Sequence, residues 1–178
     1  MERQSTPSRI TPEQRRRIES ALKNSPSQMT LQLARQLNVP EVEIIRALPD
    51  NRAVELNADR WEELFRAFEE LGDVHVIVSN SGVTCEVVGG FGGFSTWGDF
   101  FNVQSPSLDL HIRTDQLESV FAVEKPSHVD GVNTLSFQFY DRDGHAAFKV
   151  FVTFGGQKAP PERLALFTRL RERFRKPV

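Results

Sequence analysis

The hydrophobic periodicity changes partway along the chain, and this change constrains the fold more than any other feature. Up to Leu71 the apolar residues recur at the three- and four-residue spacing of amphipathic helices. From Asp73 onward they alternate with polar residues, which is the two-residue period of β-strands. A run of helices followed by a run of strands is typical of an α+β fold and not of an alternating parallel fold.

Residues 11–72 are predicted to form a helical part. Thr11 is suited to cap the first helix, because its hydroxyl can accept a hydrogen bond from a free backbone N–H. The second and third helices are expected in the segments MTLQLARQLNV and PEVEIIRAL. A fourth is expected from Ala58 to Leu71, where aromatic and aliphatic residues form one stripe, and Gly72 provides its stop.

Residues 73–178 are predicted to form an antiparallel meander of about six to eight strands, followed by a C-terminal helix in PPERLALFTRLRERF. Turn sequences at 80–82 and 141–144 separate alternating arms, as in β-hairpins. The whole is expected to be a single α+β domain over residues 11–178. The polar residues 1–10 are expected to be a disordered tail.

The charge pattern argues against nucleic acid as a partner. The formal net charge is −2, which gives no general attraction for polyanions. The segment 29–48 has the sequence pattern of a helix-turn-helix motif. However, Glu41 and Glu43 would lie at the start of its recognition helix and would repel DNA phosphates. We therefore expect no nucleic-acid partner.

Other function classes are excluded by what the sequence does not contain. No apolar run approaches the ~18 residues of a membrane span, so no membrane partner is expected and a cytoplasmic location is the default. The single cysteine, Cys85, excludes an intrachain disulfide and a zinc site built from several cysteines.

Phenylalanine is unusually frequent, with fourteen Phe against one Tyr, and most of the Phe residues follow residue 90. A phenyl ring has a large apolar area and no polar group. The strand part is therefore predicted to contain either a thick aromatic core or an apolar ligand surface, and composition alone leaves both open.

The segment SLDLHIR is the clearest candidate for a functional strand. Its alternation places Leu110 and Ile112 on one face and His111 and Arg113 on the other. An imidazole beside a guanidinium suits an anionic planar ligand, because histidine can bind a metal or a carboxylate and arginine a carboxylate. A solvated strand face is the alternative. No two histidines stand at the spacing of a local metal motif.

Four segments in order carry a resemblance to a known family: LARQLNVPEVEIIRALPDNRAVEL, RWEELFRAFEELGDVHVIV, FFNVQSPSLDLHIRTDQLESVFAVEKP and GVNTLSFQFYDRDGHAAFKVFV. Together they resemble the cytosolic haem-utilisation carrier proteins of the HutX/ChuX type, which are related to the HemS/ChuS haem-handling proteins. The resemblance covers residues 28–174. It depends on the order and spacing of the segments and not on a single motif.

The resemblance implies a helical N-terminal part packed against an antiparallel sheet, as in one half of a HemS-type protein, and a homodimer. It implies a protein that binds haem in the cytoplasm and passes it to a haem-degrading or haem-transfer protein, as a carrier more than as a catalyst. His111 matches a family position linked to haem and is the expected metal ligand. Ser79 stands where relatives have a second histidine, and Asp99 or Phe100 where they have a tyrosine.

The remaining expected haem contacts follow from the strand pattern and from the family resemblance. Phe100 and Phe101 are candidates for an aromatic surface against the porphyrin, and Arg113 and Lys149 for the propionates. His75 and Tyr140 are the alternative iron ligands if His111 does not bind the iron. At about 25 cal/mol per Å² of apolar area, burying a porphyrin contributes several kcal/mol before any iron bond forms. Two other functions stay open: a haem-degrading enzyme of the HemS type, and a regulatory or interaction module that kept the fold and lost haem.

Overall fold

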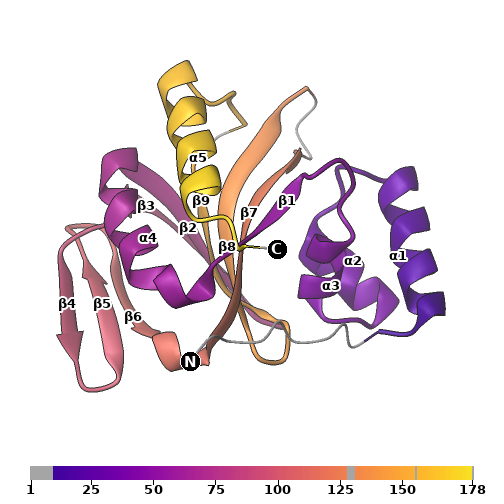
Figure 1. Ribbon diagram of the computed structural model, residues 1–178, viewed down its shortest axis with the longest axis horizontal. Helices are drawn as coiled ribbons and strands as arrows, with labels where there is room; N and C mark the ends of the chain where they lie inside the picture. Colours follow the sequence, from indigo (N-terminus) through magenta and orange to yellow (C-terminus); the bar gives the residue numbers. More distant parts are fainter. Residues whose placement is uncertain (1–9, 128–130, 155, 178) are drawn as a thin grey trace.

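The computed structural model describes residues 10–127, 131–154 and 156–177. Within these residues the helices and strands follow the predicted order, helices first and then an antiparallel meander and a last helix (Figure 1). The helices are α1 Pro12–Asn24, α2 Thr30–Leu37, α3 Glu41–Arg46, α4 Trp61–Ala67 and α5 Pro161–Arg173, with 3-10 turns η1 Ala58–Arg60, η2 Phe68–Leu71 and η3 Thr114–Gln116. The strands are β1 Ala53–Leu56, β2 Asp73–Ser79, β3 Thr84–Gly90, β4 Phe94–Trp97, β5 Phe100–Gln104, β6 Asp109–Arg113, β7 Leu117–Pro126, β8 Asn133–Asp141 and β9 Ala146–Phe151.

Helices α1 to α3 form a small unit with its own core. Thr11 caps α1 through a capping box, in which its hydroxyl accepts from the Gln14 N–H and its own N–H donates to the Gln14 side chain. Such a cap stabilises a helix by about 1 kcal/mol. The unit buries its own apolar cluster of Ile18, Leu22, Leu33, Ala34 and Ile44. Ile10, expected in the disordered tail, packs against this cluster, and the rest of that tail, 1–9, lies outside the described residues.

The first strand, β1, is absent from the prediction, which treated residues 11–72 as helical throughout. β1 pairs antiparallel with β7, and Val54 and Leu56 on it are buried. Four residues are too few to establish a two-residue period, so pairing with β7 and not local pattern defines this strand. β1 connects the α1–α3 unit to the edge of the large sheet.

The large sheet has the order β1-β7-β8-β9-β2-β3, with every neighbouring pair antiparallel. Helices α4 and α5 cover one of its faces (Figure 1). Between them lies the predicted aromatic core, which includes Phe65, Phe68, Phe137, Phe139 and Phe167, each 0–1% exposed. Each buried phenyl contributes about 2–3 kcal/mol, so this face accounts for much of the stability.

The second sheet is small and has the order β4-β5-β6. One face packs on α4, where the Phe101 ring meets Trp61 at 5.0 Å between centroids. The other face carries His111, Phe100 and Trp97. Gly93, just before β4, has φ +67°, and a Cβ there would lie 1.9 Å from the Gln104 carbonyl oxygen, so only glycine allows this close approach.

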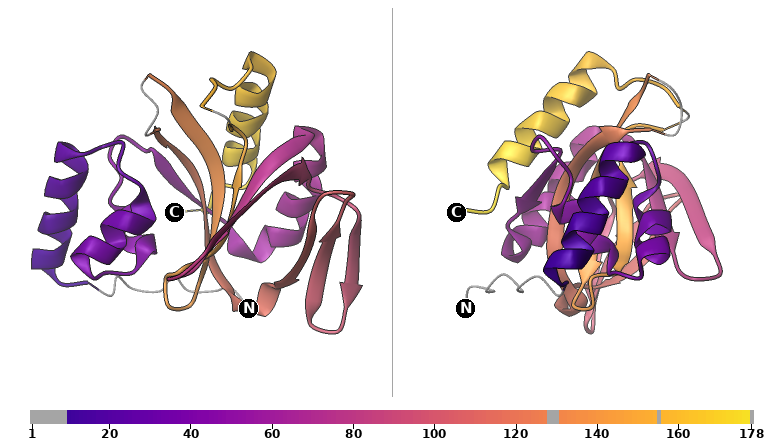
Figure 2. Two further views of the ribbon diagram at one scale, coloured as in Figure 1. Left: turned by 180° about the vertical axis from the view of Figure 1, so that it is seen from behind. Right: turned by 90° about the vertical axis from the view of Figure 1, so that its right-hand side faces the viewer.

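The second face of the large sheet is covered at one side only. Val42 and Ile45 of α3 pack on Phe121, Val123 and Tyr140, which face away from α4 and α5 on β7 and β8. The α1–α3 unit therefore lies over the β7–β8 part of this face, as two further views show (Figure 2). Ala146 of β9 also packs against this cluster, whereas none of the described residues of β2 and β3 belongs to it.

Candidate functional site

A groove lies between the α2–α3 region and the second face of the large sheet. It has a volume of about 1460 Å³ and is lined by residues of α2, the β2–β3 hairpin, β8, β9 and the end of β7. Pockets for small ligands and cofactors commonly enclose about 300–1,000 Å³, so this groove can admit a large organic ligand.

Strand alternation decides which side chains form the floor of the groove. Val74 and Val76 point to the α4–α5 core, so His75 and Ile77 of β2 point into the groove. Phe151 lies opposite His75 on β9. From the sequence His75 was only an alternative iron ligand, although the alternation of VHVIV already places it opposite the core valines.

His75 is set among aromatic rings. Its ring centroid is 6.2 Å from that of Phe151 and 6.4 Å from that of Phe154. Its Nε2 atom lies 3.0 Å from a carboxylate oxygen of Glu86 on β3. The middle of the floor is therefore an imidazole flanked by apolar rings.

The β7 end of the groove is basic. Lys125 is only 8% exposed, and its Nζ donates to the backbone carbonyls of Ser27 and Pro126 at 3.3 and 2.9 Å. Burial, together with the positive charges of Lys149 and Arg52, lowers the pKa of Lys125 to about 8. Among the described residues no carboxylate lies within ion-pair distance of Lys125, so a ligand carboxylate would meet an unneutralised ammonium there.

The wall formed by α3 holds a buried carboxylate. Glu41 accepts hydrogen bonds from Thr30, at 2.6 Å, and from Lys149, both through Oε1. Its second oxygen, Oε2, is buried and has no hydrogen-bond partner in the structure. An unsatisfied buried oxygen is costly, and a donor on a ligand or a bound water would relieve that cost.

Tyr140 does not reach the groove as an iron ligand, which corrects the sequence expectation for it. It is fully buried, and its hydroxyl donates to the Gln138 side chain at 2.6 Å. Burial raises the pKa of Tyr140 well above its usual value, and the charge of Glu41 adds to that shift. A tyrosine binds iron as the phenolate, which this environment opposes.

Phe101 is also a core residue and not a surface one. It is 3% exposed and packs against Trp61, Phe65 and Phe94. The sequence placed it beside Phe100 as a haem contact, but neighbouring residues on a strand point to opposite faces, so the two cannot serve one surface.

His111 is outside the groove of its own chain. It lies with Phe100 on the outer face of the small sheet and is 55% exposed. Its Nδ1 is 2.7 Å from Asn102 Oδ1, and its Nε2 is 3.5 Å from Asp109. The predicted alternation of this strand is confirmed, since Ile112 is buried and His111 is exposed.

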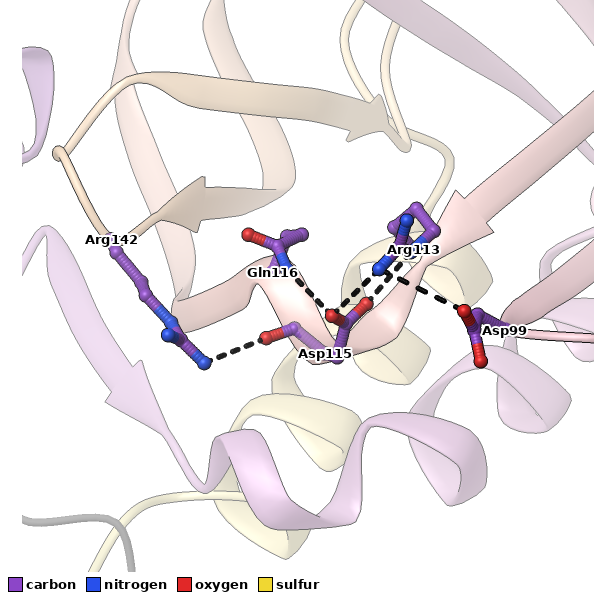
Figure 3. A network of polar contacts seen from close by, with 5 residues as sticks. All are labelled: Asp99, Arg113, Asp115, Gln116 and Arg142. Atoms are coloured by element: carbon purple, nitrogen blue, oxygen red, sulfur yellow. Dashed lines mark hydrogen bonds and ion pairs between the residues drawn. The ribbon is translucent and has the colours of Figure 1, made fainter.

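Arg113 is held by acidic neighbours (Figure 3). Its guanidinium donates twice to Asp115, at 3.0 Å each, and lies 4.0 Å from Asp99. Gln116 and Arg142 also donate to Asp115, to its side chain and backbone respectively. The hydrogen bonds from Arg113 lower the pKa of Asp115, so the carboxylate stays ionised and competes with any propionate for this guanidinium.

The six expected contacts therefore divide into three groups. Lys149 lines the groove, where its ammonium is paired with Glu41. His111, Arg113 and Phe100 share the outer face of the small sheet. Phe101 and Tyr140 are buried in the protein.

Two further findings limit the chemistry. Among the described residues, no three His, Cys, Asp or Glu side chains gather as a metal-ion site. No helix in the described part of the chain is both long and apolar enough to cross a membrane. The groove thus suits a large, partly apolar ligand with anionic groups better than it suits a free metal ion.

The fold and this groove define a class of α+β ligand-binding proteins, and comparison with known sequences identifies the family. The profile of the family "Haem utilisation ChuX/HutX" matches residues 54–170. The chain belongs to this haem utilisation family.

Three relatives illustrate the match. The intracellular haem transport protein HutX of Vibrio cholerae is 24% identical over 158 residues, which are 87% of this chain and 81% of HutX. A crystal structure of an Agrobacterium tumefaciens protein is 27% identical with a TM-score of 0.79, covering 92% of each chain. The haem-degrading enzyme ChuS of Escherichia coli O157:H7 is 24% identical with a TM-score of 0.75, covering 92% of this chain and 47% of ChuS.

Proposed function

We propose that this protein binds haem in the groove, in the cytoplasm, and passes it to a haem-degrading or haem-transfer protein during iron acquisition. The observation that carries the proposal is the composition of the groove, which combines aromatic rings at the floor with an ammonium that has no carboxylate partner among the described residues. Membership of the haem utilisation family supports the same ligand.

The two ends of the groove match the two parts of haem. The porphyrin would lie against the Phe151 and Phe154 side, and its burial contributes several kcal/mol at about 25 cal/mol per Å². The propionates would meet Lys125 and Lys149 at the other end. Ion pairs at a recessed site are screened less by salt than surface pairs, so these lysines can fix the orientation of the ligand.

We further propose that the protein works as a homodimer in which His111 of one subunit faces the groove of the other. The single-chain relative ChuS is about twice as long, since this chain matches 47% of it. Two copies of this chain would correspond to its two halves. Such an arrangement would give His111, exposed and distant from its own groove, a role at the haem of the partner subunit.

A titration of the purified protein with hemin, read by absorbance, tests the proposal. We expect a shifted Soret band that saturates at one haem per chain, with Lys125→Ala and Lys149→Ala each weakening binding by about tenfold, or about 1.4 kcal/mol. The exposed Lys158→Ala, outside the groove lining, is the matched control and should bind normally. No shifted band at micromolar protein would overturn the proposal and favour an interaction module.

The hemin complex of the same protein can also distinguish a haem carrier from a haem-degrading enzyme. With a reductant and oxygen, a carrier keeps its Soret band or releases intact haem to an acceptor such as apomyoglobin. Loss of the band together with release of iron would identify a haem-degrading enzyme instead.

A further inference from the structure

We propose that His75, on the groove face of β2, supplies the imidazole that binds the haem iron within each chain. The inference rests on the proposed haem function and goes beyond it by assigning the iron to His75, which the sequence offered only as an alternative to His111.

Position is the first argument. His75 comes from β2, which lies between β9 and the edge strand β3, with Val88 opposite it on β3 and Phe151 on β9. Both of its neighbouring strands hydrogen-bond to β2, so the backbone that presents the ring is held on two sides. A ligand on a strand paired on both sides is positioned more precisely than one on a loop.

Exposure is the second argument, because it separates His75 from His145, the other histidine among the described residues that line the groove. The side chain of His75 is 17% exposed and recessed between Phe151 and Phe154. His145 also lines the groove but is 72% exposed and follows the turn between β8 and β9. A macrocycle that covers the aromatic floor therefore meets the ring of His75.

The existing partner of His75 is easy to replace. Glu86, whose carboxylate lies 3.0 Å from Nε2, has a side chain more than half exposed to solvent. A contact with such a solvent-exposed carboxylate is weaker than a bond from imidazole to iron. Iron binding at Nε2 leaves a neutral ring with its proton on Nδ1, so any proton shared with Glu86 leaves to solvent and the carboxylate swings out.

The spacing between His75 and the basic end fits a single ligand. Lys125 is on β7 and His75 on β2, and β8 and β9 lie between these strands. Three strand spacings separate the backbones of β7 and β2 by about 14 Å. The side chains of Lys125 and His75 reach inward from these strands, which shortens the distance between them to the scale of a haem group. Iron at His75 therefore leaves the propionates directed toward Lys149 and Lys125.

The test compares the hemin complexes of the wild type, His75→Ala and the matched control His145→Ala. We expect His75→Ala to shift the Soret and visible bands and to weaken binding at least tenfold, while added imidazole restores the wild-type spectrum. His145→Ala should leave the spectrum unchanged. A wild-type spectrum in a folded His75→Ala complex would overturn the assignment, whereas failure of the wild type to bind hemin would overturn the proposed function itself.

A measurement on the unmodified chain covers the case in which His75→Ala fails to fold. Gallium protoporphyrin is a diamagnetic analogue of hemin, and its titration into ¹⁵N-labelled wild type can be followed through the imidazole nitrogen resonances. Coordination should move Nε2 of His75 strongly and leave His145 unaffected. Saturable binding without movement of the His75 signal would contradict the proposal.

Discussion

At the scale of single residues, Lys125 is a groove residue whose buried charge lowers the stability of the folded protein. An ammonium with its pKa lowered to about 8 by burial and by two nearby cations destabilises the folded state when it is charged. The same unneutralised charge is what a ligand carboxylate would bind. The residue thus favours binding at the expense of folding, as is common at functional sites.

Replacing Lys125 should therefore stabilise the protein. The folded-state pKa of about 8 lies below the unfolded value of 10.5, so the unfolded chain holds more protons between these two values. Below pH 8 the penalty on the folded state is full, and it disappears as the pH rises through 8 toward 10.5. We expect Lys125→Met to raise the free energy of unfolding at pH 7 by about 2 kcal/mol and to lose that advantage near pH 10.5.

Urea denaturation of wild type and Lys125→Met across this pH range measures the difference. Lys23→Met, on the exposed surface of α1, serves as the control and should show no pH-dependent gain. A constant difference between Lys125→Met and wild type from pH 7 to 10.5 would show that charge is not the cause.

At the scale of elements, a hydrogen bond from a side chain to the backbone attaches α2 to the far side of the groove. Arg35, in the last turn of α2, donates from Nη2 to the carbonyl of Asn80 at 2.6 Å. Asn80 begins the turn between β2 and β3, where its side chain accepts from the backbone of Gly82 and Val83. The contact joins the helical unit to the hairpin whose strands form the floor.

Arg35→Ala should change the rate of ligand exchange more than stability. The contact is exposed, so its loss should alter the free energy of unfolding by less than about 1 kcal/mol. We expect haem transfer to apomyoglobin, followed by stopped-flow absorbance, to become several-fold faster. Arg16→Ala, on the exposed side of α1, is the control, and equal transfer rates in all three proteins would exclude a role for the contact.

At the scale of the whole molecule, the outer face of the small sheet carries an exposed aromatic side chain. Trp97 on it is 77% exposed, beside Phe100 and His111. Exposed tryptophan is uncommon on a monomer and frequent at the centre of interfaces. A second copy of the chain is the partner that the proposed dimer provides.

Trp97→Asp should convert the dimer to a folded monomer. A buried, unpaired carboxylate at an interface costs several kcal/mol, enough to dissociate a dimer of micromolar affinity. Sedimentation velocity reads the oligomeric state, and Leu164→Asp, on exposed α5, is the matched control that should remain dimeric. The haem spectrum of the Trp97→Asp monomer should match that of His111→Ala, and a monomeric wild type would refute the dimer.

The sequence by itself determined the local structure of this protein. Thr11 caps α1, the helical segment from Ala58 stops at Gly72, and Ile112 is buried while His111 is exposed, all as periodicity predicted. These features depend on residues within a few positions of one another, so the sequence contains the whole cause. The family and the α+β fold follow from the order of such segments.

Only the tertiary structure decided where the groove lies and which residues share it. His75 meets Phe151 because β2 pairs with β9. Lys149 of β9 meets Glu41 of α3, and its charge acts on Lys125 of β7, because these elements converge on one face. These pairings join segments far apart in the chain, and no local pattern encodes their register. The sequence therefore pointed to the histidine in the most regular strand, while strand pairing brought a different histidine to the floor of the groove.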